Sequence, residues 1–173
     1  EIMAILCLAK NFPDLRQRVR KIIFGYTRKL QPVTCDRLKA DAAMVVLLRD
    51  AILPNLVQTL EHTPVLVHGG PFANIAHGAS SIVADRLAMS YADYVVTECG
   101  FGADLGFEKF MHIKTRTSEL KPSAAVMVVS VRALKSHGGV RRRDLGTPDE
   151  EAVRRGAPNL EHLVGVIRSF GLP

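Results

Sequence analysis

The stretch TPVLVHGGPFANIAHG, residues 63–78, decides the fold that we predict for this chain. In it a short apolar run, rich in β-branched residues, passes directly into a glycine-rich polar turn. The stretches 93–106 and 124–139 repeat this order of apolar run and turn. Short apolar runs separated by helix-length segments are typical of buried parallel strands. We therefore predict an α/β fold in which a parallel sheet is covered by helices.

The turns after the three predicted strands contain the candidate functional residues. Ligands of open α/β sheets gather at the carboxyl ends of the strands. Eight of the 13 glycines of the chain lie in these turns, and glycine lets the backbone approach a ligand closely. We expect the three turns to line one pocket.

Glu98 is the sharpest single candidate, because it ends the second predicted strand and is followed by Gly100 and Gly102. A carboxylate at this point can hold Mg²⁺ directly or through water, and the glycines leave room for phosphate oxygens. The alternative is an acid that only caps the next turn. Asp104 fits two interpretations equally well: a second metal ligand, or the N-cap of the helix that follows.

The first turn contains two histidines, His68 and His77, whose spacing does not match a zinc site. Gly69 and Gly70 precede a proline and favour a rigid, open turn. Asn74 and His77 are candidates for hydrogen bonds to a bound anion or heterocycle. On spacing alone, an asparagine helix cap and a surface histidine are about as well supported.

Three cations follow the third predicted strand: Arg132, Lys135 and His137. Cations at that end of a sheet are well placed to neutralise a transferring phosphoryl group. Each of them alone is more often a solvated loop charge. The phosphate loop G-x-x-x-x-G-K-[ST] of nucleotide-cleaving enzymes is absent, and the chain has no Gly-Lys dipeptide.

Composition limits the function classes. The chain has 47% hydrophobic and 23% charged residues and a net charge of +6, as expected for a globular protein. No apolar run approaches the ~20 residues of a membrane helix. Aromatic residues are scarce and are not interleaved with the basic ones, which argues against nucleic-acid binding. A solvated basic face is the simplest interpretation, and attraction of anionic substrates is the second.

Three cysteines without metal or redox spacing indicate reduced thiols, so we expect a cytoplasmic protein. A catalytic Cys99 is the alternative, without an evident base nearby. The pattern predicts helices over residues 1–9, from Pro13, over 36–50, over 53–60, along 75–87, over 107–115 and from an N-cap at Thr147. We treat residues 1–173 as a single partial domain, because the chain begins in a helical pattern and ends where a further strand is expected.

Several long motifs resemble formate–tetrahydrofolate ligase, also called 10-formyltetrahydrofolate synthetase. They span residues 63–78, 94–106 and 131–139, with further likeness at 1–6 and 54–61. The resemblance implies an internal part of a P-loop NTPase-like core that lacks its phosphate loop. It also implies ATP-dependent ligation of formate to tetrahydrofolate through formyl phosphate, with Mg²⁺, a monovalent cation such as K⁺ or NH₄⁺, and a homotetramer.

Carried over by position, Glu98 with Gly100 and Gly102 matches the family's acidic strand end near the nucleotide phosphates. The turns 68–78 and 132–139 match other segments that face the active site of the family. The sequence departs from the family pattern at Cys99, Phe107, His112 and Val129-Ser130. A function of another class stays open: a non-catalytic remnant that binds an anion or a partner subunit.

Overall fold

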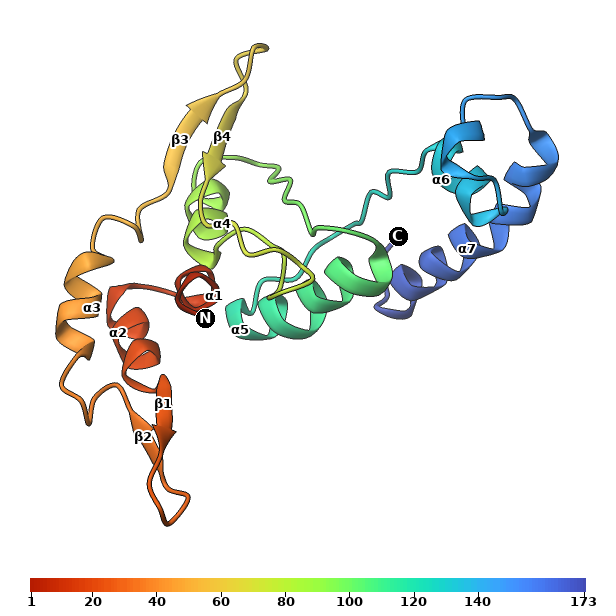
Figure 1. The fold of residues 1–173 in the computed structure, drawn as a ribbon. Coiled ribbons are helices and arrows are strands. Elements are labelled where there is room, and N and C mark those ends of the chain that lie inside the picture. Colours follow the sequence, from red (N-terminus) through yellow and green to blue (C-terminus); the bar gives the residue numbers. More distant parts are fainter.

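Helices form most of the regular structure, and the computed structural model describes all residues 1–173 (Figure 1). The α-helices are α1 (Ile2–Leu8), α2 (Phe12–Arg20), α3 (Asp41–Leu47), α4 (Ile82–Met89), α5 (Arg116–Ser118), α6 (Val131–His137) and α7 (Glu150–Ser169). Two π-helical segments, η1 (Ala103–Phe107) and η2 (Phe110–Thr115), and a 3₁₀ turn, η3 (Arg142–Asp144), join them. The strands are β1 (Ile23–Tyr26), β2 (Pro32–Thr34), β3 (Asn55–Gln58) and β4 (Pro64–Val67).

The main hydrophobic core lies among α1, α2 and α3. Helix α2 begins at Phe12, one residue before the predicted start at Pro13, because the side chain of Asn11 caps it by accepting a hydrogen bond from the backbone N–H of Asp14 at 2.9 Å. Its apolar stripe faces inward and its arginines face outward, as the 3.6-residue period predicts. The buried members of this core are Leu6, Ala9, Leu15, Val19, Ile22, Cys35, Val45 and Ile52.

The strands form two separate antiparallel hairpins, β1–β2 and β3–β4. The first predicted strand is present as β4, but its neighbour is β3, with Asn55 opposite Val67 and Gln58 opposite Pro64. The predicted helix over 53–60 is therefore wrong. Pro54 lacks the N–H that a helix interior requires, and the residues after it pair residue for residue with β4.

The two other predicted strands are not formed, and the structure contains no parallel sheet. Residues 93–97 make no backbone-to-backbone hydrogen bond, and the segment 124–130 is irregular up to the start of α6. A strand is stable only when a neighbour satisfies its N–H and C=O groups, and these segments have no strand beside them. The fold that the structure shows is a mixed α/β arrangement.

The second core joins η1 to α7, where Phe107 meets Phe170 edge to face with ring centroids 5.5 Å apart. The predicted helix over 107–115 is present in π-helical form. Helix α7 begins later than predicted, since Asp149, not Thr147, is the N-cap, and its carboxylate accepts from Ala152 N–H at 2.9 Å. Helices α3 and α4 also begin later than the pattern predicts, at Asp41 and Ile82.

The elements follow one another along an elongated molecule (Figure 1). Helices α1 to α4 and the two hairpins lie at one end, the segment from η1 to α5 lies in the middle, and α6 with most of α7 lies at the other end. None of the helices combines the length and apolar character that crossing a bilayer requires.

Candidate functional site

The first turn begins at His68, whose ring is held by two hydrogen bonds. His68 is buried, and its Nε2 lies 2.7 Å from the carbonyl oxygen of Ala51. Because a carbonyl only accepts, Nε2 carries the proton and Nδ1 accepts from the hydroxyl of Ser81 at 2.5 Å. Ser81 in turn caps α4 by accepting from Ala84 N–H at 2.9 Å. Both ring nitrogens of His68 are thus engaged within the fold.

The rest of the first turn forms a short helical turn. The N–H groups of Ile75 and Ala76 both donate to Phe72 O, at 3.0 and 2.7 Å. The side chain of Lys109 donates to Ala73 O and to Ala76 O, the latter at 3.0 Å. The other predicted binding residues of this turn, Gly69, Gly70 and Asn74, are exposed.

The structure brings the first turn together with the second. Gly100 N–H donates to Gly78 O at 2.9 Å, and an isolated antiparallel bridge pairs Ala79 with Cys99. Gly78 has a φ of 64°, and a Cβ there would lie 2.4 Å from the Cβ of Ala73. Only glycine allows the first turn to fold back this closely on Ala73, which places Gly78 O where Gly100 N–H can reach it.

The predicted metal ligands lie on the second turn. Glu98 and Asp104 are both exposed. Asp104 is not the N-cap, a position that Gly102 occupies; it lies in the first turn of η1. A Cβ on Gly102 would lie 2.6 Å from Asp104 Oδ1, so the missing side chain gives this carboxylate room beside the loop.

A buried polar cluster lies close to both turns. Lys114 Nζ is 2.5 Å from Asp85 Oδ2, in an ion pair without hydrogen-bond geometry, and 5.1 Å from the centre of the Phe110 ring. The side chain of Lys114 is 1% exposed. The cation–π contact and the carboxylate compensate in part for the loss of hydration of the ammonium group.

His77 is 2% exposed, and neither of its ring nitrogens has a hydrogen-bond partner. Burial lowers the pKa of His77 below its usual value. The backbone of Ala4 lies near the ring without forming a hydrogen bond and partly opposes this decrease in the pKa. The positive charges of Lys114 and Lys109 lower the pKa further. The imidazole is therefore neutral at pH 7, in contrast to the surface histidine that spacing alone allowed.

The cysteines nearby are thiols. Burial raises the pKa of Cys7 and that of Cys99 above the usual value. For Cys99 the charge of Glu98 adds to the pKa increase. A protonated thiol is a weak nucleophile, so the environment of Cys99 does not favour a catalytic role.

The third turn lies elsewhere, so the predicted single pocket is not present in this structure. Its residues form α6, which packs along α7 away from α4 (Figure 1). Arg132 and His137 are exposed there. Lys135 is buried, and its Nζ donates to Leu145 O at 2.7 Å and to Thr147 O, which closes the connection between α6 and α7.

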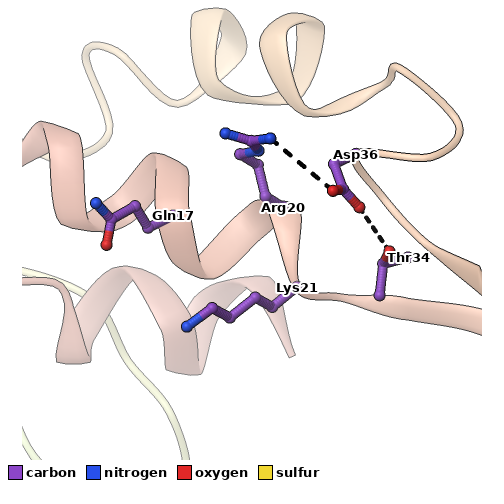
Figure 2. Close-up of a pocket in the computed structure, with 5 residues that line it drawn as sticks. All are labelled: Gln17, Arg20, Lys21, Thr34 and Asp36. Carbon is purple, nitrogen blue, oxygen red and sulfur yellow. Dashed lines mark hydrogen bonds and ion pairs between the residues drawn. The ribbon is translucent and has the colours of Figure 1, made fainter. Parts of the chain in front are cut away.

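Two of the surface cavities can be compared with the predicted site. The larger one, of about 260 Å³, lies between α2 and β2 and contains none of the predicted site residues (Figure 2). Its lining is entirely polar: Gln17, Arg20, Lys21, Thr34 and Asp36. The smaller one, of about 150 Å³, lies along η1 and η2 and includes Asp104, Glu108 and Lys109. No cluster of three or more histidine, cysteine or acidic side chains has a metal-binding arrangement.

Sequence reasoning missed three residues that hold this region together: Asp85, Lys109 and Lys114. All three belong to segments predicted as helices, where a lone charge normally indicates a solvated face. No spacing signal marks them as buried or as partners.

Comparison with known proteins then identifies the relationship. A family model described as "Formate--tetrahydrofolate ligase" matches residues 1–173. The chain belongs to the formate–tetrahydrofolate ligase family. A curated relative named formate–tetrahydrofolate ligase, from Cereibacter sphaeroides (strain ATCC 17025 / ATH 2.4.3), is 59% identical over 173 residues. These residues are 100% of this chain and 31% of the relative, so the chain spans about a third of the length of that ligase.

Proposed function

We propose that this chain forms part of an enzyme that ligates formate to tetrahydrofolate with ATP, giving 10-formyltetrahydrofolate, ADP and phosphate through formyl phosphate. The observation that carries the proposal is the match to the formate–tetrahydrofolate ligase family along the whole chain, with 59% identity to the curated relative. The joining of the first two turns through Gly78 and Gly100 supports it, because both turns were predicted to face the ligand.

Mg²⁺ fits the second turn. Magnesium is usually held by one or two protein carboxylates together with substrate phosphates and water. Glu98 and Asp104 supply two exposed carboxylates on one short loop, and no third protein ligand is required. When bound, the ion would neutralise charge on the phosphate oxygens. Gly100 and Gly102 would leave the backbone accessible to those oxygens.

The first turn is proposed to contact the substrate through its exposed members, Gly69, Gly70 and Asn74. His68 contributes by anchoring the turn to α4, since both of its nitrogens are engaged. His77 is a neutral imidazole close to Lys109 and Lys114. Its proposed catalytic role, as an acceptor of a proton close to the transferring group, requires the ring, which is 2% exposed here, to become accessible in the complete enzyme.

Among the cations of the third turn, Arg132 is the exposed candidate for stabilising the transferring phosphoryl group, with His137 beside it on α6. A catalytic role for Lys135 requires its ammonium group to leave the carbonyls of Leu145 and Thr147. The proposal therefore needs α6 to approach the first two turns in the complete enzyme.

Exposed apolar segments support the proposal of a parallel, P-loop-like sheet in the complete protein. Along 124–129, Ala125 and Met127 pack on the second core, whereas Val126 and Val128 are 92% and 93% exposed. This alternation has the period of a strand. We propose that 64–67, 93–97 and 124–129 become strands of one sheet when paired with further chain, in a cytoplasmic homotetramer that also uses a monovalent cation.

The test uses the full-length protein with ATP, formate and tetrahydrofolate. Formation of 10-formyltetrahydrofolate and ADP is measured with all substrates and with each one omitted. We expect product only with all three, and Glu98→Gln to lower kcat about 10²-fold and to raise the Mg²⁺ concentration needed. The control Glu161→Gln, at an exposed position of α7, should stay near the wild-type rate. Absence of product from the folded protein would favour a non-catalytic protein that binds an anion or a partner subunit.

A further inference from the structure

The side chain of Lys109 donates to two backbone carbonyl groups that receive no hydrogen bond from the backbone. Its Nζ donates to Ala76 O at 3.0 Å and also to Ala73 O. No backbone N–H donates to either of these carbonyl groups. Carbonyls at the end of a helical turn need a donor from outside the turn. The ammonium group thus serves as the C-terminal cap of the turn 72–76.

The position of Lys109 in the chain makes this cap a tie between two segments. Lys109 lies between η1 and η2, on the helical segment that directly follows the second turn. The hydrogen bond from Gly100 N–H to Gly78 O is a second tie between the same segments. His68 holds the start of the first turn and the Gly100–Gly78 hydrogen bond holds its end. Lys109 adds a contact between these two points, at Ala73 and Ala76, and so fixes the orientation of the middle of the turn.

The tie is made from the buried side of the first turn. Ala73 is 1% exposed and His77 is 2% exposed, whereas Gly70 and Asn74 are exposed. Lys109 therefore holds the turn without using the groups that remain accessible to a ligand.

We propose that Lys109 is a positioning residue, which fixes the first turn against the second so that their exposed groups meet the substrate in one arrangement. This inference rests on the proposed ligase function. Misplacement of a substrate-binding segment by about 1 Å can lower the rate about 10²-fold, so the effect belongs mainly in kcat rather than in stability.

The test compares Lys109→Met with Lys109→Arg in the full-length protein. Arginine keeps donors for the two carbonyls and methionine has none. Lys121→Met is the matched control, because Lys121 is exposed and makes no hydrogen bond or ion pair. Two readouts are combined: hydrogen exchange of the Ile75 and Ala76 amides, and kcat together with KM for each substrate.

We expect Lys109→Met to speed exchange of these two amides about tenfold or more, since local opening becomes easier. The Val19 amide in α2 should be unaffected. In the same variant, kcat should fall about 10- to 10²-fold, and Lys109→Arg should recover most of it. Unchanged exchange would overturn the proposal, and so would faster exchange with an unchanged kcat.

The experiment distinguishes failure of the proposed ligase function from failure of the proposed role of Lys109. If the wild-type protein makes no product, the ligase proposal fails, whereas the exchange comparison still decides whether Lys109 holds the turn. If Lys109→Met does not fold, the same comparison is made between Lys109→Arg and Lys109→Leu, which also lacks a donor.

Discussion

Nζ of the buried Lys114 lies 2.5 Å from Oδ2 of Asp85, and this ion pair joins η2 to α4. Both elements pack close to the two joined turns. The pair is therefore a structural support of the candidate site, although neither residue is a candidate ligand.

Lys114→Met should lower the free energy of unfolding by about 3–5 kcal/mol, because it leaves the carboxylate of Asp85 without its partner in a mostly buried place. The double variant Lys114→Met with Asp85→Asn should be less destabilised than the single one. Urea unfolding measures both. Asp50→Asn, which breaks the exposed pair Arg49–Asp50, is the control and should change stability by less than about 1 kcal/mol. A single variant as stable as the control would contradict the assignment.

Two glycines of α7 should respond to alanine in opposite directions. A Cβ on Gly156 would lie 2.0 Å from Leu134 O, so Gly156→Ala must push α6 away and should cost about 1–3 kcal/mol. A Cβ on Gly165 would meet nothing within 4 Å, so Gly165→Ala should stabilise α7 by about 0.5–1 kcal/mol. Thermal unfolding of the two variants checks this, and the same sign for both would refute the close packing of α6 on α7.

Stability should rise with pH around the ordinary imidazole pKa because of His77. Its pKa is lowered in the folded state by burial, with a contribution from Lys114 and Lys109. The unfolded chain therefore binds the proton first. The stability from neutral His77 is complete above its usual pKa of 6.5 and is lost as the pH falls below that value.

His77→Gln should flatten this pH dependence, whatever its effect on stability at pH 8. The free energy of unfolding is measured at several pH values from 5 to 8 for both proteins. His137→Gln, at an exposed position, is the control and should keep the wild-type slope. An identical slope in His77→Gln would show that another group is responsible.

Substitutions of Lys135 and Arg132 test a structural role and a catalytic role separately. Lys135→Met leaves the carbonyls of Leu145 and Thr147 without their donor and should cost about 1–3 kcal/mol. Arg132→Ala removes an exposed side chain without a partner and should leave stability within about 0.5 kcal/mol. If Arg132→Ala nevertheless lowers kcat of the full-length protein, its proposed role at the phosphoryl group gains support.

Local signals in the sequence predicted local structure well. The helix predicted from Pro13 is present as α2, and the apolar residues Leu15 and Val19 of its stripe are buried. The first two turns, which were predicted to lie together with the third at one pocket, do meet, through the hydrogen bond from Gly100 N–H to Gly78 O. Their glycines were predicted to admit a ligand, and the structure shows two of them joining the turns.

Pairing was not predictable, because a strand depends on residues outside it. Leu53, Leu56, Val57 and Leu60 have helical spacing, yet β3 forms because 55–58 finds 64–67 across a hairpin. The segment 93–97 has strand composition, but β-propensity expresses how well side chains fit a paired, half-buried surface. The burial of Lys114 and the hydrogen bonds of Lys109 to the first turn could not be predicted from the sequence for the same reason. Each depends on an element far away along the chain.

The exposed apolar segments also determine how readily the isolated chain aggregates. Val96, Val126 and Val128 are each more than 90% exposed, at 97%, 92% and 93%, in runs of β-branched residues with few charges. Such runs recruit copies of themselves into intermolecular sheets. The isolated 173-residue polypeptide should therefore aggregate as its concentration rises, and lysine at position 126 or 128 should keep it in solution longer.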